Sequence, residues 1–305
     1  MSLDQREQAA TYDVRRSLLS RGLVTMLAAC AVLFAVSAIF APTSVTRGPI
    51  LGMLPFAAVL GIVALGQTLV IQQGGIDLSV AGSVSLVVVV STHQAAGDDG
   101  RLLRAVLLAL GIVILAGVLN GLLIGRLGLN AIVATLGTNS LLYSAVFVVS
   151  NGIPRTTTDL LADIGGGRSW GIPNSVYFAV AATIVTTLAV KSSVAGRRFE
   201  AVGANPVAAA TSGLRIHRHQ VGAYVWAQIH YWLGAVLLAG IVTQPTAFQG
   251  NSYLLPSVAA VVLGGTSLRG GRGNLTATVV AALFLSQLQQ FVLALGVTFA
   301  VRTLV

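Results

Sequence analysis

Asp77 is the only acidic residue within the hydrophobic part of this 305-residue sequence, and it lies in the stretch IQQGGIDLSVAGS at residues 71–83. Two adjacent glycines, Gly74 and Gly75, precede it, and paired glycines within an apolar run weaken a regular helix. An ionisable side chain at such a break is costly in lipid, so it is expected to face protein or a water-filled cavity. This stretch therefore predicts a moving or pathway-lining part of a membrane transport protein.

Asp77 also has a purely structural interpretation, as a cap for the helix predicted to begin near Val80. A carboxylate near a helix N-terminus is stabilised by the helix dipole and by backbone N–H groups that have no partner within the helix. Other polar residues in the apolar runs can line a path for a hydroxyl-rich solute or simply bond between helices. With both interpretations open, the candidate pathway or gating residues are Gly74, Gly75, Asp77, Ser79, Asn120, Thr135, Gly264 and Gly265.

A second glycine break, GGTSLRGGRG at residues 264–273, follows a short apolar piece near the end of the sequence. It shares the pattern Gly-Gly-x-x-Leu with the first break when Gly74 is aligned with Gly264. Glycine-interrupted segments at corresponding places in two halves of a chain point to a transport pathway. Because glycine is frequent here, with 34 residues, a chance match is the alternative.

No group of residues has the spacing of a catalytic or metal site. The histidines have no metal-ligand spacing with carboxylates or with the single cysteine; they are His93, His217, His219 and His230, and the cysteine is Cys30. We expect His217 and His219 to be solvated in a basic loop, and His230 to be a packing residue with satisfied hydrogen bonds. A nucleotide-binding loop of the GxxxxGK[ST] type is missing, so the chain is not expected to hydrolyse ATP itself. The sequence predicts neither an enzyme nor a cofactor or metal of its own.

The composition is that of an integral membrane protein. Hydrophobic residues make up 55% of the chain, charged residues only 9%, and the mean hydropathy is +0.86, whereas a soluble domain carries about 25% charged residues. The apolar runs of about 17–22 residues suit helices across a hydrocarbon core of about 30 Å and are too long for barrel strands. We therefore predict an all-α, polytopic membrane protein with about nine to ten transmembrane helices, some of them broken by glycine.

The predicted spans divide the chain into a polar tail at residues 1–22 and a single transmembrane permease domain at 23–305. The spans are 23–41, 50–71, 80–92, 102–124, 131–150, 175–190, 221–242, 256–263, 275–295 and a final helix at 297–305 that looks incomplete.

The basic residues give this arrangement an orientation. When spans alternate from an inside start, twelve basic residues fall in inside segments and five in outside segments. Basic residues concentrate in cytoplasmic loops, so the N-terminus is predicted to be cytoplasmic. The net charge of +9 has the same explanation and does not indicate a nucleic-acid partner.

The longest predicted cytoplasmic loop, at residues 191–219, contains a signal for a short helix. Asn205 and Pro206 form a typical helix start, an alanine-rich run follows at 207–212, and Gly213 is a typical stop. A small helix flanked by charge is suited to docking into another protein, and an ordinary loop is the alternative.

Five stretches, in the same order along the chain, resemble the permease subunits of ribose-type (simple sugar) ATP-binding cassette (ABC) importers. Together they extend over about two-thirds of the chain. They are QGGIDLSVAGSV (73–84), NGLLIGRLGLNAIVATLGT (120–138), SNGIP (150–154), RRFEAVGANPVAAATSGL (197–214) and VVLGGTSLRGGRGN (261–274).

This resemblance implies a multi-pass permease of a bacterial cytoplasmic (inner) membrane that moves a ribose- or xylose-like monosaccharide inward. It implies three protein partners besides membrane lipid: a cytoplasmic subunit that binds the ATP, an extracytoplasmic sugar-binding protein and a second permease copy. By position, the coupling segment to the ATP-binding subunit would contain Glu200, Gly203, Asn205, Ala208, Ala209 and Gly213.

The sequence departs from the family pattern in three places. Ala81 is an insertion after the glycine-aspartate signature, His230 begins an unusually polar and aromatic His-Tyr-Trp run, and the chain ends at Val305 within the expected final helix. The alternatives are an ABC permease for another small solute, such as a nucleoside or a branched-chain amino acid, a truncated subunit that does not transport, and an ion-driven carrier.

Overall fold

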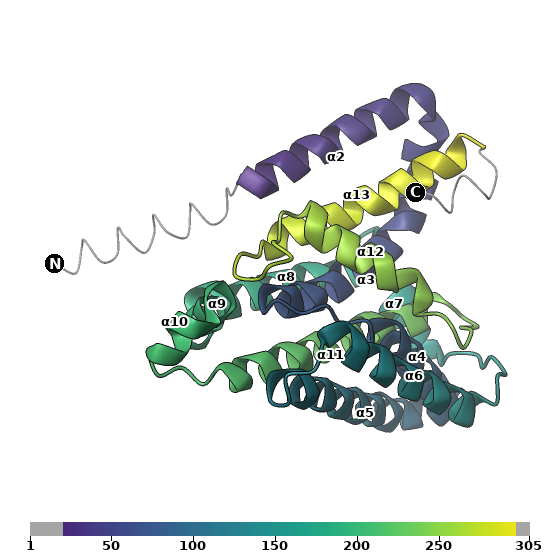
Figure 1. Cartoon of the computed structure of the whole chain (residues 1–305). Helices are drawn as coiled ribbons and strands as arrows, with labels where there is room; N and C mark the ends of the chain where they lie inside the picture. Colours follow the sequence, from purple (N-terminus) through teal and green to yellow (C-terminus); the bar gives the residue numbers. More distant parts are fainter. Residues whose placement is uncertain (1–20, 297–305) are drawn as a thin grey trace.

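The computed structural model describes residues 21–296, which form a bundle of helices with one β-hairpin whose strands are two residues long (Figure 1). Within these residues, seven helices are long and apolar enough to cross a membrane, and two shorter helices, α4 (Val80–Ala95) and α12 (Asn251–Leu263), are also apolar. The seven are α2 (Arg21–Phe40), α3 (Arg47–Gln72), α5 (Asp99–Gly125), α6 (Ala131–Ser150), α8 (Asn174–Ser192), α11 (Ile216–Ile241) and α13 (Leu275–Ala294).

These nine apolar helices correspond to the nine complete spans predicted from the sequence. The prediction of an all-α, polytopic membrane protein is therefore confirmed. The incomplete helix at 297–305 and residues 1–20 of the predicted tail lie outside the described residues, and the cytoplasmic N-terminus stays a prediction.

The remaining elements are η1 (Pro42–Val45), α7 (Asp159–Gly166), β1 (Arg168–Ser169), β2 (Ile172–Pro173), α9 (Val194–Ala204) and α10 (Pro206–Thr211).

The predicted loop at residues 191–219 contains more helix than expected. α8 continues to Ser192, α9 and α10 follow, and α11 already begins at Ile216. α9 forms because the Ser193 hydroxyl accepts the Gly196 N–H at 2.9 Å as an N-cap, and because Val202 is buried against the bundle. His217 and His219 consequently belong to the first turn of α11, and the ring of His217 bonds to the Gly125 carbonyl instead of being fully solvated.

The extent to which a helix is buried does not follow from its hydropathy. α3 is buried along 89% of its most apolar window, whereas α5, with a higher hydropathy, is buried along 33%. α3 packs against α8, α11, α12 and α13, and α4 is also enclosed, by α5, α6, α11 and α12. α2 packs along α13 at the edge of the bundle (Figure 1). The centre of the molecule is therefore the broken pair α3–α4, which carries Asp77.

Close packing between α5 and α11 depends on glycines at every fourth position of α5. Gly117, Gly121 and Gly125 face α11, and a Cβ added to Gly121 would lie 2.6 Å from Val221 Cα. Small residues at this spacing let two helix backbones approach each other, which is the usual basis of helix association in lipid.

Replacing Gly121 by leucine is expected to lower the unfolding free energy by about 2 kcal/mol, because the contact with α11 would be overpacked. The matched control is Gly111→Leu in the same helix, since a Cβ added to Gly111 meets no atom within 4 Å. Thermal unfolding in detergent, followed by size-exclusion chromatography, measures the difference. Equal stability of the two variants would contradict the proposed role of the α5–α11 contact.

Candidate functional site

A buried polar network surrounds Asp77, at the break between α3 and α4. The Asp77 carboxylate accepts hydrogen bonds from the Ser79 backbone N–H at 2.9 Å and the Ser79 hydroxyl at 2.5 Å, and Asp77 is fully buried. Gln228 of α11 donates to Ser79 Oγ at 3.0 Å and lies 3.4 Å from Asp77 Oδ2. Asn120 of α5 donates to the same hydroxyl at 3.0 Å and accepts from Thr138 of α6 at 2.5 Å. The network therefore links the break to three neighbouring helices.

Two side chains of α6 satisfy the backbone on either side of the start of α4. Thr135 Oγ1 accepts the Leu78 N–H at 3.0 Å, and Asn139 Oδ1 accepts the Gly82 N–H at 2.7 Å. Asp77 accepts the N–H of Ser79, the N-cap residue, whereas the Ser79 side chain itself caps no N–H group of α4. Asp77 therefore fixes the turn that precedes α4, and its role as a cap stays a prediction. A role for Asp77 in a pathway stays a prediction.

Both glycine breaks end the preceding helix with the same backbone motif. In each, a glycine in the left-handed region follows the helix, Gly74 with φ 78° and Gly265 with φ 82°. The N–H of the next residue, Gly75 or Thr266, bonds at 3.2 Å to the carbonyl five residues earlier, as in a Schellman motif. Gly74 thus corresponds to Gly265. The predicted alignment of Gly74 with Gly264 is wrong by one residue, because the second break uses the other glycine of its pair.

The two breaks and the segment between α8 and α11 meet at the carbonyl of Gln72, the last residue of α3. The Gly271 N–H donates to Gln72 O at 2.9 Å. Gly203 of α9 approaches the same carbonyl so closely that an added Cβ would overlap the oxygen. The next residue, Gln73, donates its side-chain amide to Phe199 O at 2.9 Å. We call Gln72, Gly203 and Gly271 the Gln72 junction.

The short helix α10 begins and ends as predicted. The Asn205 side chain accepts the Ala208 N–H at 3.0 Å, and Gly213, with φ 79°, follows the helix in the left-handed conformation. Ala209 is buried against the protein, whereas Ala208 is exposed and Val207 is 75% exposed. α10 therefore presents a small apolar face away from the bundle.

The structure separates the predicted site residues outside α10 into two groups, with Gly203 at the Gln72 junction. Asp77, Ser79, Asn120 and Thr135 belong to the buried network, with Gly74 and Gly75 in the same break. Glu200, Gly264 and Gly265 instead border a cavity of about 670 Å³ beside α9, where Glu200 pairs with Lys191. The Gln72 junction lies between the two groups.

Further contributors to the site include polar span residues and one backbone group. Thr138, Asn139 and Gln228 are among the polar span residues that the sequence offers for lining a path or for bonding between helices. The structure assigns Thr138 and Gln228 to the Asp77 network and Asn139 to the backbone of α4. Gln72 contributes its backbone carbonyl, and because every residue has one, the sequence cannot point to it. His230 is a satisfied packing residue, as predicted: it bonds to Thr186 Oγ1 and to Trp226 O, each at 2.8 Å.

Apolar helices around a polar, glycine-broken pair are suited to a membrane transport protein. Residues 49–305 match the family described as "Branched-chain amino acid transport system / permease component", and the chain belongs to this family. The recognition of an ABC permease from its five motifs is thereby confirmed, and the chain is a multi-pass inner-membrane protein. Permease subunits of this family are not catalytic.

Curated relatives match most of the chain. It is 33% identical to "Ribose import permease protein RbsC" of Escherichia coli (strain K12), over 89% of this chain and 86% of that permease. It is 35% identical to the Bacillus subtilis (strain 168) protein of the same name, over 88% and 84%. It is 33% identical to "Probable ABC transporter permease protein y4mJ" of Sinorhizobium fredii (strain NBRC 101917 / NGR234), over 84% and 77%. No solved structure matches the chain.

Proposed function

We propose that this chain is the permease subunit of an ABC importer that moves a ribose- or xylose-like monosaccharide inward. The observation that carries the proposal is the similarity to two ribose import permeases, at 33% and 35% identity over 89% and 88% of this chain. The buried hydroxyl and amide groups around Asp77 are compatible with a path for a hydroxyl-rich solute.

ATP would be bound and hydrolysed by a separate cytoplasmic subunit that docks on α9 and α10. The exposed Val207 and Ala208 of α10 support this, because an apolar face without a partner within the described residues is suited to a protein contact. A second permease copy would complete the membrane unit, and an extracytoplasmic sugar-binding protein would deliver the solute on the opposite side.

The Gln72 junction offers a route from this docking face to the Asp77 network. A movement of α9 would act on the end of α3, since Gly203 lies directly against the Gln72 carbonyl. The same carbonyl accepts from Gly271, so the second glycine break would move with the first. The left-handed Gly74 then provides a flexible point between α3 and the network.

Uptake into proteoliposomes tests the proposal. The permease is reconstituted with the ATP-binding subunit and the binding protein encoded beside it, and accumulation of radiolabelled ribose, xylose, leucine and adenosine is compared. We expect pentose uptake that requires both ATP and the binding protein. Uptake of leucine or adenosine alone would contradict the solute class, and pentose uptake without ATP would contradict the ABC mechanism.

A further inference from the structure

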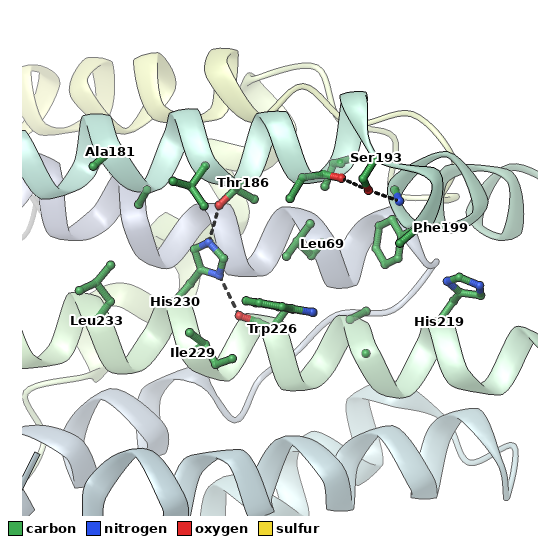
Figure 2. Close-up of a pocket in the computed structure, with 18 of the residues that line it drawn as sticks. Leu69, Ala181, Thr186, Ser193, Phe199, His219, Trp226, Ile229, His230 and Leu233 are labelled. Atoms are coloured by element: carbon green, nitrogen blue, oxygen red, sulfur yellow. Dashed lines mark hydrogen bonds between the residues drawn. The ribbon is translucent and has the colours of Figure 1, made fainter. Parts of the chain in front are cut away.

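A groove of about 610 Å³ runs between α8 and α11 and reaches the start of α9 (Figure 2). Its volume is within the range of about 300–1,000 Å³ that is typical of ligand pockets. Its outer side is bordered by exposed apolar residues, since Phe178, Val185 and Trp226 are 39%, 66% and 58% exposed. α8 and α11 are both membrane-spanning candidates, so the groove opens toward the surrounding lipid.

The inside of the groove is apolar although a histidine lies in it. His230 Nδ1 bonds to the Trp226 carbonyl and must carry the proton there, so Nε2 accepts from the Thr186 hydroxyl (Figure 2). Gly222 faces the groove and leaves open space, because a Cβ added to it meets no atom within 4 Å. Both ring nitrogens of His230 have hydrogen-bond partners, and the space beside Gly222 is open. The groove is therefore suited to a hydrocarbon chain rather than to a polar solute.

The end of the groove near α9 is positively charged. Arg218, in the first turn of α11, supplies this charge, and that turn contains no acidic residue. His219 lines the same end, but burial and the nearby Arg198 lower its pKa, so it is present mainly as a neutral imidazole that can donate one hydrogen bond. Cations at a helix N-terminus are unfavourable beside the positive end of the helix dipole. Within residues 21–296, the ion pairs are Arg101 with Asp98 and Lys191 with Glu200, so Arg218 has no carboxylate at salt-bridge distance.

We propose that this groove binds an anionic phospholipid, with one acyl chain between α8 and α11 and the headgroup phosphate beside Arg218 and His219. Basic pockets between membrane helices at the cytoplasmic side are favourable for acidic headgroups, and this end of α11 is predicted to be cytoplasmic. A zwitterionic headgroup would bring a second positive charge next to Arg218 and is therefore a poorer ligand. The lipid would also touch Phe199 of α9, the residue whose carbonyl is bonded to Gln73.

Native mass spectrometry of the full-length chain in mild detergent tests the site. The protein is titrated with phosphatidylglycerol or with phosphatidylcholine of the same acyl chains. We expect one phosphatidylglycerol per chain to be retained in preference to phosphatidylcholine. Gly222→Phe, which fills the groove, should abolish this retention, and Arg218→Ser should weaken it about fivefold.

Two matched variants control for general effects. Gly111→Phe introduces the same side chain into open space on α5, and Arg215→Ser removes a neighbouring charge that does not line the groove; both should retain lipid as the wild type does. A second filling variant, Ala189→Leu, covers the case that Gly222→Phe does not fold. Equal retention of both lipids, or unchanged retention by the filling variants, would overturn the proposal. A third outcome would also overturn it: Gly222→Phe dissociates a dimer but leaves lipid retention unchanged. The groove would then be an interface between two copies of the chain.

Discussion

Replacing Gly203 by valine is expected to reduce ATP-driven sugar uptake to background while leaving the membrane-spanning helices folded. An added Cβ on Gly203 would overlap the Gln72 carbonyl oxygen and would lie 3.1 Å from the side-chain amide of Gln73. The Gln73 side chain can shift, but the Gln72 carbonyl is held in place by the bond that it accepts from Gly271. α9 would have to separate from the end of α3, and the proposed route from the ATP-binding subunit to the Asp77 network would be interrupted.

Two measurements in proteoliposomes distinguish lost coupling from lost folding. Uptake and ATP hydrolysis by the assembled transporter are compared for the wild type, Gly203→Val and the control Ala201→Val. Ala201 lies in the same helix and is exposed, so the control introduces the same side chain away from the Gln72 carbonyl. We expect Gly203→Val to assemble and hydrolyse ATP without uptake. Normal uptake by Gly203→Val would show that the Gln72 junction does not transmit the movement.

The spans are predictable from the sequence because the bilayer imposes a length and a composition on them. The hydrocarbon core requires about 20 apolar residues from any helix that crosses it, and all nine complete spans are found in the structure. α10 is predictable for a different reason, since Asn205 and Gly213 are local signals that need no tertiary contact. α9 carries two glycines and two arginines, and its helix depends on the burial of Val202 against the bundle.

The candidate site is predictable in part. Asp77 stands out because a lone carboxyl group in an apolar sequence requires polar partners. Which residues become those partners depends on the packing of α5, α6 and α11, and hydropathy carries no information about that packing. Likewise, α3 and α5 look equally suited to face lipid, yet only α3 is enclosed. The Gln72 junction rests on a backbone carbonyl and on two glycines without side chains, so side-chain chemistry in the sequence does not point to it.

Replacing Asp77 by alanine is expected to lower the unfolding free energy by about 3 kcal/mol. The Ser79 N–H would lose its partner in a fully buried place, and the Ser79 hydroxyl would lose the acceptor of its proton while still receiving from Asn120 and Gln228. A buried polar group without a partner costs more than the hydrogen bond that it replaces is worth. The start of α4 would then be free to shift away from α5 and α11.

Asp77→Asn is the matched control, because it keeps the shape of the side chain and one carbonyl oxygen. That oxygen can still accept both bonds from Ser79. The new amide nitrogen would stand where Asp77 Oδ2 now accepts from Gln228, and the Gln228 carbonyl oxygen, which has no hydrogen-bond partner among the described residues, can turn to accept from it. The contact that is lost, from Gln228 to Asp77 Oδ2, is the longest in the network at 3.4 Å, so we expect a cost of less than about 1 kcal/mol.

Thermal unfolding in detergent and sugar uptake in proteoliposomes are measured for both Asp77 variants. If Asp77 acts by holding the break between α3 and α4 in place, Asp77→Asn should keep most of the wild-type stability and most of its uptake, whereas Asp77→Ala should lose both. An Asp77→Asn variant as stable as the wild type but without uptake would contradict a purely structural role. The negative charge itself would then be required, and Asp77 would belong to the pathway or its gate.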